Sequence, residues 1–202
     1  MTDYKNLEQI IFKTKHGNGD SDRHGITLFA LALSIGAKRI LELGVRSGNT
    51  TLPFLMAAQE TGGMVYSVDL DSATFKCPSD LKVYWNFTQQ DAHAWLDQAC
   101  ATEQTFDLIY IDDWHSYLHV KKELEYIDNM ISPSGLILLH DLMYSDAQPH
   151  YRCNYTSDDP QWAQGGPYRA VAELDTKKWE WATVPVNHGL TILRKKTEQI
   201  LS

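Results

Sequence analysis

The sequence has few cysteines and no long apolar run. Cys77, Cys100 and Cys153 are its three cysteines, an odd number at wide spacing that suits neither a disulfide framework nor a paired-cysteine zinc site. We therefore expect reduced thiols. No run approaches the ~18 uninterrupted apolar residues of a membrane-spanning helix, and the first residues contain no signal-peptide core. These absences predict a soluble cytoplasmic protein.

The sequence also lacks an excess of positive charge. Lys and Arg total 18 against 26 Asp and Glu, which gives a formal net charge of -8. A chain of this balance has no broad positive field to attract nucleic acid or an anionic membrane surface. We expect a small molecule as the partner, and a homo-oligomer is compatible with the composition. The length of 202 residues, 43% of them hydrophobic, predicts one domain over residues 1–202.

Helical and strand patterns alternate along most of the chain, which is typical of a layered α/β domain with a mostly parallel sheet. Polar turns and glycines separate the segments, and the last two strands are expected to form an antiparallel pair at a sheet edge. The expected strands are residues 39–43, 64–68, 82–88, 106–111, 136–139, 179–184 and 190–194. The expected helices are residues 21–36, 49–62, 91–101 and 116–131, with a further helix from 167.

Residues 144–167 are polar, aromatic and rich in turn formers. The segment is too long for an ordinary connection, which predicts a lid or specificity loop. Its aromatic side chains would offer a surface for a sugar, a phenol or a polyketide. An ordered surface loop or an oligomer contact is the alternative.

A glycine turn joins the first predicted strand to the next helix. Gly44 can turn sharply, and Gly48 lets the backbone approach a ligand at the helix start. Arg46 lies between them, and we expect it to contact the same ligand. Asp69 ends the following strand, where a carboxylate can accept both ribose hydroxyls of a nucleoside. The spacing G-x-G-x-x-G is absent, so a dinucleotide, and with it an NAD-dependent oxidoreductase, is disfavoured.

These residues resemble the first motif of class I S-adenosylmethionine-dependent methyltransferases, in which an acidic residue precedes G-x-x-x-G. Glu42, Gly44 and Gly48 match it. The resemblance implies that the glycine loop contacts the methionine part of S-adenosylmethionine, that Asp69 holds the ribose and that Asp91 meets the adenine amino group. Asp91 is equally well placed to be the N-cap of the helix that follows it.

Acidic residues also follow two later strands. Asp112 comes directly after residues 106–111, and Asp141 follows the apolar run 136–139 and His140. Ligand sites in parallel sheets lie beyond the carboxyl ends of the strands. Asp112 and Asp141 could share one cation if these strands pair, and oxygen ligands of this kind suit Mg²⁺. Asp113 is expected to be an exposed turn residue.

The second half of the chain resembles metal-dependent small-molecule O-methyltransferases, a branch that includes macrolide-sugar methyltransferases and the cephalosporin-hydroxylase-like group. The resemblance covers about residues 36–145, and its pattern is roughly I-D-x-x-H-x-Y-x-x-V, a turn, and an acidic pair or His-Asp after the next strand. The matching positions are Ile111, Asp112, His115, Tyr117, Val120, residues 133–135, His140 and Asp141. It implies a Rossmann-like fold with a mostly parallel seven-stranded sheet and an antiparallel C-terminal strand, helices covering both faces. It also implies methyl transfer to a hydroxyl, with Asp112 and Asp141 as metal ligands and His115 as general base.

Several alternatives remain open at this stage. His140 stands where the acidic-pair members carry a second acid, and it can be a third metal ligand, a hydrogen-bond donor to a ligand or a core histidine. His119 would share a helix face with His115 if both were helical, giving a transition-metal site with Asp112. The resemblance to the hydroxylase-like members also leaves open an Fe(II) site formed by His115, His140 and one carboxylate, Asp112 or Asp141. A nucleoside-binding protein without turnover is the non-enzymatic alternative.

Overall fold

The computed structural model describes residues 5–19, 21–143 and 164–196. Its seven-stranded sheet has the order β3-β2-β1-β4-β5-β7-β6. The first five strands in the chain run parallel, and β7 pairs antiparallel with both β5 and β6. The strands are β1 (Arg39–Leu43), β2 (Met64–Asp69), β3 (Trp85–Gln89), β4 (Phe106–Ile111), β5 (Ile131–His140), β6 (Trp179–Val184) and β7 (Leu190–Lys195). The predicted fold class is confirmed.

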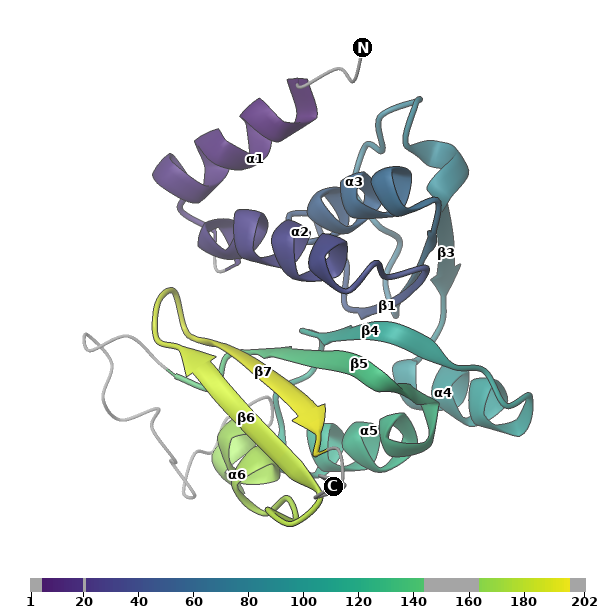
Figure 1. Ribbon diagram of the computed structural model, residues 1–202, viewed down its shortest axis with the longest axis vertical. Helices are drawn as coiled ribbons and strands as arrows, with labels where there is room; N and C mark the ends of the chain where they lie inside the picture. The colour runs from purple at the N-terminus through teal and green to yellow at the C-terminus, as the bar shows by residue number, and fades with distance from the viewer. Residues whose placement is uncertain (1–4, 20, 144–163, 197–202) are drawn as a thin grey trace, which may run out of the picture.

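Helices cover both faces of the sheet (Figure 1). On one face lie α1 (Lys5–His16), α2 (Gly25–Ser34) and α3 (Thr51–Thr61); on the other lie α4 (Ala92–Ala101), α5 (Tyr117–Met130) and α6 (Gly166–Ala172). Two hydrophobic clusters result, one containing Phe54 and the other Leu124. The central strands contribute to both clusters, which is why their sequences are mostly apolar.

The strand order reverses between β1 and β4, which are neighbours although β2 and β3 come between them in the chain. Connections from these two strands leave toward opposite faces and open a crevice beyond their carboxyl ends. The glycine turn follows β1 and the first acidic cluster follows β4. The topology therefore brings the two predicted half-sites to one edge of the sheet.

The structure differs from the expected elements in several places. Helix α1 was not predicted; it packs through the buried Ile10. Lys82–Tyr84, expected to begin a strand, form the 3₁₀ helix η2. Strand β5 starts at Ile131 rather than residue 136, with a register shift against β4. A Cβ at Gly135 would lie 2.8 Å from the carbonyl oxygen of Asp107, so the glycine permits this irregular start.

A short 3₁₀ helix, η1 (Asp22–His24), precedes α2, whereas the sequence predicted one continuous helix from about residue 21. Of the predicted lid, residues 144–163 lie outside the described residues, and its function stays a prediction. Cys77 and Cys100 are free thiols, as expected, and Cys153 lies outside the described residues.

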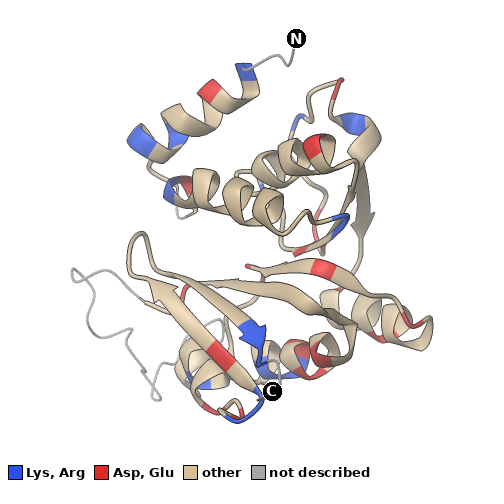
Figure 2. Ribbon diagram, viewed as in Figure 1, with Lys and Arg blue, Asp and Glu red and all other residues tan. Residues whose placement is uncertain are grey.

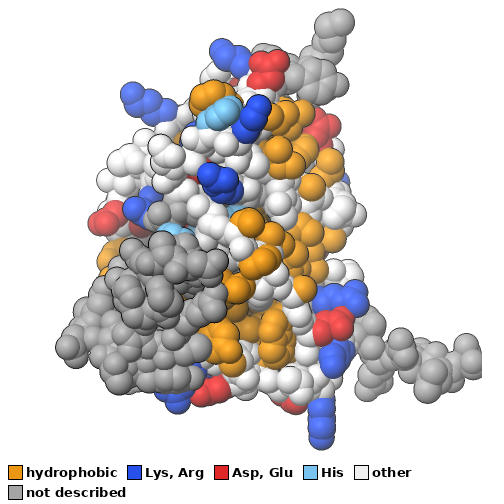
Figure 3. Space-filling model, turned by 90° about the vertical axis from the view of Figure 1, so that its left-hand side faces the viewer, with side chains coloured by type: hydrophobic (Ala, Val, Ile, Leu, Met, Phe, Trp, Pro, Cys, Tyr) orange, Lys and Arg blue, Asp and Glu red, His pale blue; other side chains and the backbone are white. Residues whose placement is uncertain are grey.

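The surface carries mixed charge. Figure 2 shows basic residues on α1 and at the end of β7, and acidic residues on strand β6 and on several helices, α1 among them, so the two signs are interspersed in this view. Figure 3 shows hydrophobic side chains in a band on the face at the left of Figure 1. Homo-oligomerisation and the exclusion of nucleic acid stay predictions.

Among the described residues, no helix is long and apolar enough to cross a membrane.

Candidate functional site

The glycine turn lies directly against the end of β4. Gly44 has φ +88°, and a Cβ there would lie 2.3 Å from the carbonyl oxygen of Asp112. Only glycine satisfies both the positive φ and this close approach. Gly48 has φ +75°, and a Cβ there would overlap the ring of Phe75 at 2.3 Å. The second glycine therefore makes room for an aromatic side chain, whereas the sequence predicted room for a ligand.

Glu42 lies beneath this turn and is fully buried. Thr50 Oγ1 donates to its Oε1 at 2.7 Å, Thr51 Oγ1 donates to the carboxylate at 2.9–3.0 Å, and Ser67 Oγ donates to Oε2 at 2.6 Å. Burial raises the pKa of Glu42 to about 7, although these hydrogen bonds lower it. Glu42 thus ties the start of α3 to β1 and β2, which differs from the direct cofactor contact expected of it. Its side chain therefore stabilises the glycine turn through these hydrogen bonds.

Asp69 also stabilises the glycine turn. Its Oδ2 accepts hydrogen bonds from the backbone N–H groups of Val45 and Arg46 at 2.8 and 3.0 Å. The side chain of Asp91 caps α4, accepting from Ala94 N at 2.9 Å, as one of its two predicted roles required. Both carboxylates also line a cavity, so their predicted contacts with ribose and adenine stay open.

This cavity has a volume of about 530 Å³. Its lining includes Gly44, Arg46, Asp69, Asp91 and Asp112. A second cavity of about 210 Å³ shares Gly44, Arg46 and Asp112 with it and continues along the start of α3. A cavity of this size at the switch point of a parallel sheet suits a nucleoside-containing ligand. The side chain of Asp112 belongs to both spaces.

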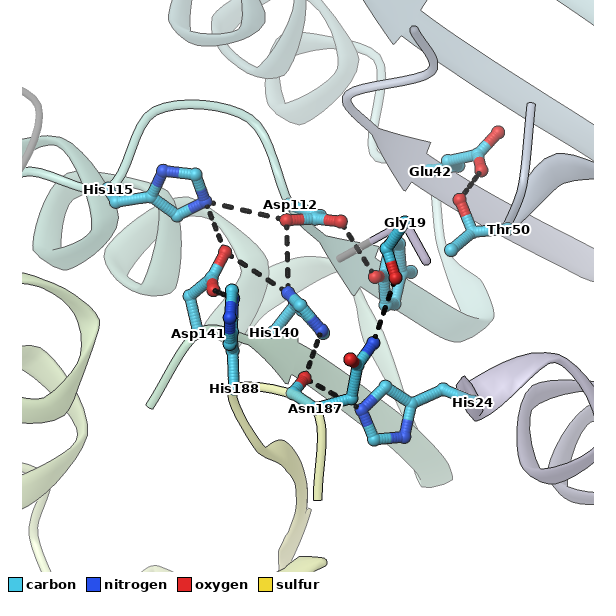
Figure 4. Close-up of polar contacts among 11 residues, drawn as sticks. Gly19, His24, Glu42, Thr50, Asp112, His115, His140, Asp141, Asn187 and His188 are labelled. Atoms are coloured by element: carbon cyan, nitrogen blue, oxygen red, sulfur yellow. Dashed lines mark hydrogen bonds and ion pairs between the residues drawn. The ribbon is translucent and has the colours of Figure 1, made fainter. Parts of the chain in front are cut away.

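Four side chains from the ends of β4 and β5 converge beside these cavities (Figure 4). His115 Nε2 lies 2.8 Å from Asp141 Oδ2 and 3.4 Å from Asp112 Oδ1. His140 Nδ1 lies 3.1 Å from Asp141 Oδ2 and 3.5 Å from Asp112 Oδ1. Strands β4 and β5 pair in parallel, which was the condition for Asp112 and Asp141 to meet. The structure thus brings together the residues predicted for the acceptor site.

The orientation of His140 favours a cation at this point. Its Nε2 lies 3.0 Å from the carbonyl oxygen of Asn187; a carbonyl only accepts, so Nε2 carries the proton. Nδ1 is buried and faces the carboxylates of Asp112 and Asp141 at 3.5 and 3.1 Å, and in the neutral ring it carries a lone pair. A lone pair directed at carboxylate oxygens is repelled unless a positive charge lies between them, and either a proton on Nδ1 or a metal ion supplies that charge.

The separations of the four donor atoms also fit a metal. Ligand atoms that share an ion at about 2.0–2.2 Å lie roughly 2.9–3.5 Å apart in octahedral or tetrahedral geometry. The observed separations run from 2.8 to 3.5 Å. Two carboxylates and two imidazoles can therefore hold a divalent ion with little movement. Asp112, His115 and Asp141 each place a ligand atom within 4.8 Å of the others, and the contacts of His140 Nδ1 agree with its role as a further metal ligand or as a hydrogen-bond donor to the carboxylates.

The pKa values in this cluster are set by the attraction between the carboxylates and the imidazoles, which acts against burial. Burial lowers the pKa of His115, but hydrogen bonds and charges from Asp112 and Asp141 outweigh burial and raise the pKa to about 10. The same carboxylates hold the pKa of His140 well above its usual value against burial. Burial favours the protonated form of Asp141, yet the histidines around it hold its pKa well below the usual range. Without a metal, the imidazoles supply the positive charge that the carboxylates require.

Sequence reasoning missed several residues that support this cluster. Tyr110 donates its hydroxyl hydrogen to Asp112 Oδ2 at 2.9 Å. His188, in the loop between β6 and β7, places Nδ1 3.1 Å from Asp141 Oδ1. The neighbouring Asn187 presents its carbonyl oxygen to both His24 and His140. The alternation within residues 106–111 placed Tyr110 in the sheet, but no local pattern connects residues 187 and 188 with β5.

Non-glycine residues with positive φ occur at this edge of the sheet. Asp141 has φ 66°, Asn187 φ 46° and His188 φ 70°. Each costs roughly 1 kcal/mol or more in this region, and such strain concentrates at functional sites. The strained backbone turns the side chains of Asp141 and His188 toward each other.

Two expectations about neighbouring residues are wrong. Asp113 is not an exposed turn residue, since its side chain is 18% exposed and pairs with His119 Nε2 at 3.0 Å. His119 does not join His115 in one site, because α5 begins only at Tyr117, with Ser116 as its N-cap. His115 therefore faces Asp112 and Asp141, while His119 faces Asp113.

The fold and the turn-and-acid arrangement define a class I methyltransferase fold. The profile of the methyltransferase domain family matches residues 41–142, which is just over half of the chain. The chain belongs to this family. No curated protein sequence matches the chain.

Solved structures share the fold at low sequence identity. An O-methyltransferase from Bacillus cereus in complex with SAH (S-adenosylhomocysteine) has a TM-score of 0.68 and 18% identity, covering 97% of this chain and 93% of its own. The O-methyltransferase TomG from Streptomyces achromogenes, involved in tomaymycin synthesis and in complex with SAM (S-adenosylmethionine), has a TM-score of 0.64 and 14% identity, over 97% and 92% of the two chains. The methyltransferase MycE of the mycinamycin pathway, in complex with Mg and SAH, has a TM-score of 0.66 and 15% identity; 98% of this chain matches 55% of that one.

Proposed function

We propose that this chain transfers a methyl group from SAM to a hydroxyl of a small molecule of the sugar, phenol or polyketide type. Asp112, His140 and Asp141 would hold a divalent ion, with Mg²⁺ the first candidate. The observation that carries the proposal is the cluster of two carboxylates and two imidazoles beside a cavity lined by the glycine turn. The solved structures of similar fold that contain SAM, SAH or Mg support it.

Different residues around the cavities would bind different parts of the cofactor. The carboxylate of Asp69 would accept the ribose hydroxyls and that of Asp91 the adenine amino group, since both line the larger cavity. Gly44 and Arg46 line both cavities and would lie along the methionine part. Asp112 lies at the junction, so a methyl group held there would face the acceptor side.

His115 has the geometry of a general base. When bound, a divalent ion would lower the pKa of the acceptor hydroxyl. The carboxylates of Asp112 and Asp141 raise the pKa of His115, and a cation shared between them would offset that effect. His115 Nε2 would then take the hydroxyl proton as the oxygen bonds to the methyl carbon. The carbon–sulfur bond breaks in the same step and the sulfonium leaves as a neutral thioether, so positioning supplies most of the remaining acceleration.

Transfer of a radiolabelled methyl group from SAM to a panel of phenols and sugars tests the proposal, with Mg²⁺, Mn²⁺ or Fe²⁺ and with chelator. His115→Gln should lower turnover by roughly 10²–10⁴-fold and leave SAH affinity within about twofold. The matched control, His16→Gln, changes an exposed histidine on α1 and should retain full activity. Absence of SAM binding at millimolar concentration, or turnover that chelator does not affect, would contradict the proposal. SAH binding without turnover on any acceptor would favour the non-catalytic alternative.

The two imidazoles favour one second candidate, an Fe(II)-dependent hydroxylase-like reaction. Nitrogen donors favour Fe²⁺ over Mg²⁺, and His115 would then be a ligand rather than a base. Oxygen consumption with Fe²⁺ and a hydroxylated product, formed without loss of SAM, would distinguish this reaction from methyl transfer.

A further inference from the structure

A second group of potential metal ligands lies outside the site described above. His119 Nε2 lies 3.0 Å from Asp113 Oδ2 and 3.5 Å from Glu123 Oε1. His119 and Glu123 are one turn apart on α5, so they share a helix face. His93, from the first turn of α4, offers a further ligand atom: those of His93, His119 and Glu123 all lie within 4.8 Å of one another. Residues of two helices and one loop thus meet at one point.

Glu123 is the least expected member of this group. Its side chain is 0% exposed, and neither carboxylate oxygen has a hydrogen-bond partner. Asp113 Oδ1 is likewise buried without a partner. An unsatisfied buried carboxylate is costly, and three such oxygens in one group exceed what the single imidazole of His119 can satisfy. Burial raises the pKa of Glu123 well above its usual value, so either a proton on Glu123 or a cation that contacts several of these oxygens would satisfy them.

The histidines can present lone pairs to such a cation. His93 Nε2 lies 3.2 Å from the carbonyl oxygen of His119; the carbonyl only accepts, so Nε2 is the protonated nitrogen in the neutral ring and Nδ1 carries the lone pair. The rings of His93 and His119 are stacked, with centroids 4.1 Å apart. Two stacked imidazolium cations would repel each other, and burial lowers the pKa of His93, so the lone pair of His93 Nδ1 is available to a cation.

We propose that Asp113, His119 and Glu123, with His93 as fourth ligand, form a binding site for Zn²⁺ or a similar transition-metal ion. Two imidazoles and two carboxylates are ligands that Zn²⁺ accepts in tetrahedral geometry, with donor atoms roughly 3.3 Å apart. The 3.0 and 3.5 Å separations at His119 agree with that spacing. The two nitrogen donors, one more than the proposed acceptor site uses, disfavour Mg²⁺ and Ca²⁺.

This site would fix the loop that carries the acceptor-site residues. Asp112 and Asp113 are adjacent, and they face different clusters: Asp112 pairs with His115, and Asp113 pairs with His119. Asp113 and His119 also line the larger cavity. A metal bound to them would hold the loop between β4 and α5 at both ends. The proposal is independent of the proposed methyl transfer, because it needs neither cofactor nor acceptor.

Titration of the metal-free full chain with Co²⁺, followed by visible absorption, tests the site, because Co²⁺ reports tetrahedral coordination. Asp141→Asn removes a ligand of the acceptor site and weakens it, so the tightly bound metal in this variant reports the second site. We expect one equivalent with strong tetrahedral bands, displaced by Zn²⁺. Adding Glu123→Gln should raise the Kd by more than about a hundredfold.

Glu125→Gln is the matched control, because it makes the same change at an exposed position of α5 and should leave the Kd unchanged. Asp113→Asn, on the loop rather than in the core, is measured in parallel and should weaken Co²⁺ binding to a similar extent. Failure of the Asp141→Asn chain to bind Co²⁺ at micromolar concentration would overturn the proposal. Binding that survives in both Glu123→Gln and Asp113→Asn would also overturn it.

Discussion

Replacement of Glu42 by glutamine should change how stability depends on pH. Glu42 is fully buried, and burial raises its pKa from 4.5 to about 7. The folded chain therefore retains a proton that the unfolded chain releases between these two values. Stability from this group is fully present below pH 4.5 and is lost as the pH rises to about 7. Glutamine resembles the protonated acid and does not titrate, so Glu42→Gln removes this loss.

The magnitude follows from the size of the shift. A pKa raised by about 2.5 units corresponds to roughly 3 kcal/mol at about 1.4 kcal/mol per unit. The hydrogen bonds from Thr50 and Thr51 to Oε1 survive in the variant, because the amide oxygen also accepts. Ser67 Oγ would accept from the amide nitrogen, as it already does from Trp85 Nε1.

Urea denaturation of both chains at pH 5 and pH 8 measures the effect. Relative to the native chain, Glu42→Gln should gain roughly 2.5 kcal/mol of stability between pH 5 and pH 8, because part of the full effect is already lost at pH 5. Glu60→Gln, at an exposed position on α3, should show no such gain. A stability difference between Glu42→Gln and the native chain that stays constant over this pH range would refute the assignment of a raised pKa to Glu42.

Two further predictions concern residues next to Asp112, namely Gly44 in the glycine turn and Tyr110 on β4. Gly44→Ala should cost roughly 3 kcal/mol or more, because it combines a positive φ with a Cβ 2.3 Å from the carbonyl oxygen of Asp112. Gly36→Ala has a similar φ but no atom within 4 Å of its Cβ, so it should cost only about 1–2 kcal/mol by denaturation; equal costs would argue against the close approach. Tyr110→Phe removes the 2.9 Å hydrogen bond to Asp112 and should weaken divalent-metal binding by about 10–100-fold in calorimetry. Tyr66→Phe, also in the sheet, should not.

Much of the fold was predictable because its signals are local. The alternation of apolar strands and helices predicted the sheet, and the break before residue 190 predicted the antiparallel hairpin of β6 and β7. Helix α1 was missed because its polar sequence contributes one buried side chain, Ile10. The early start of β5 was missed because Pro133 and Gly135 are typical of a turn, whereas here they accommodate a register shift against β4.

The candidate site was predictable where residues follow strands. Asp112 and Asp141 lie at the carboxyl ends of neighbouring parallel strands, and that geometry depends only on strand order. The contribution of His188 was not predictable, because it depends on how the β6–β7 loop reaches β5 and on an uncommon backbone conformation. The separate orientations of His115 and His119 depend on where α5 begins, and helix boundaries are poorly determined by sequence.

The central claim is that Asp112, His140 and Asp141 hold a divalent ion next to the methyl donor. A crystal structure with SAH and Mn²⁺, with the ion located by its anomalous scattering, tests this claim most directly. The account predicts one ion about 2.2 Å from a carboxylate oxygen of Asp112 and of Asp141 and from His140 Nδ1, with SAH along the glycine turn. An ion bound elsewhere only, or SAH outside the two cavities, would contradict it.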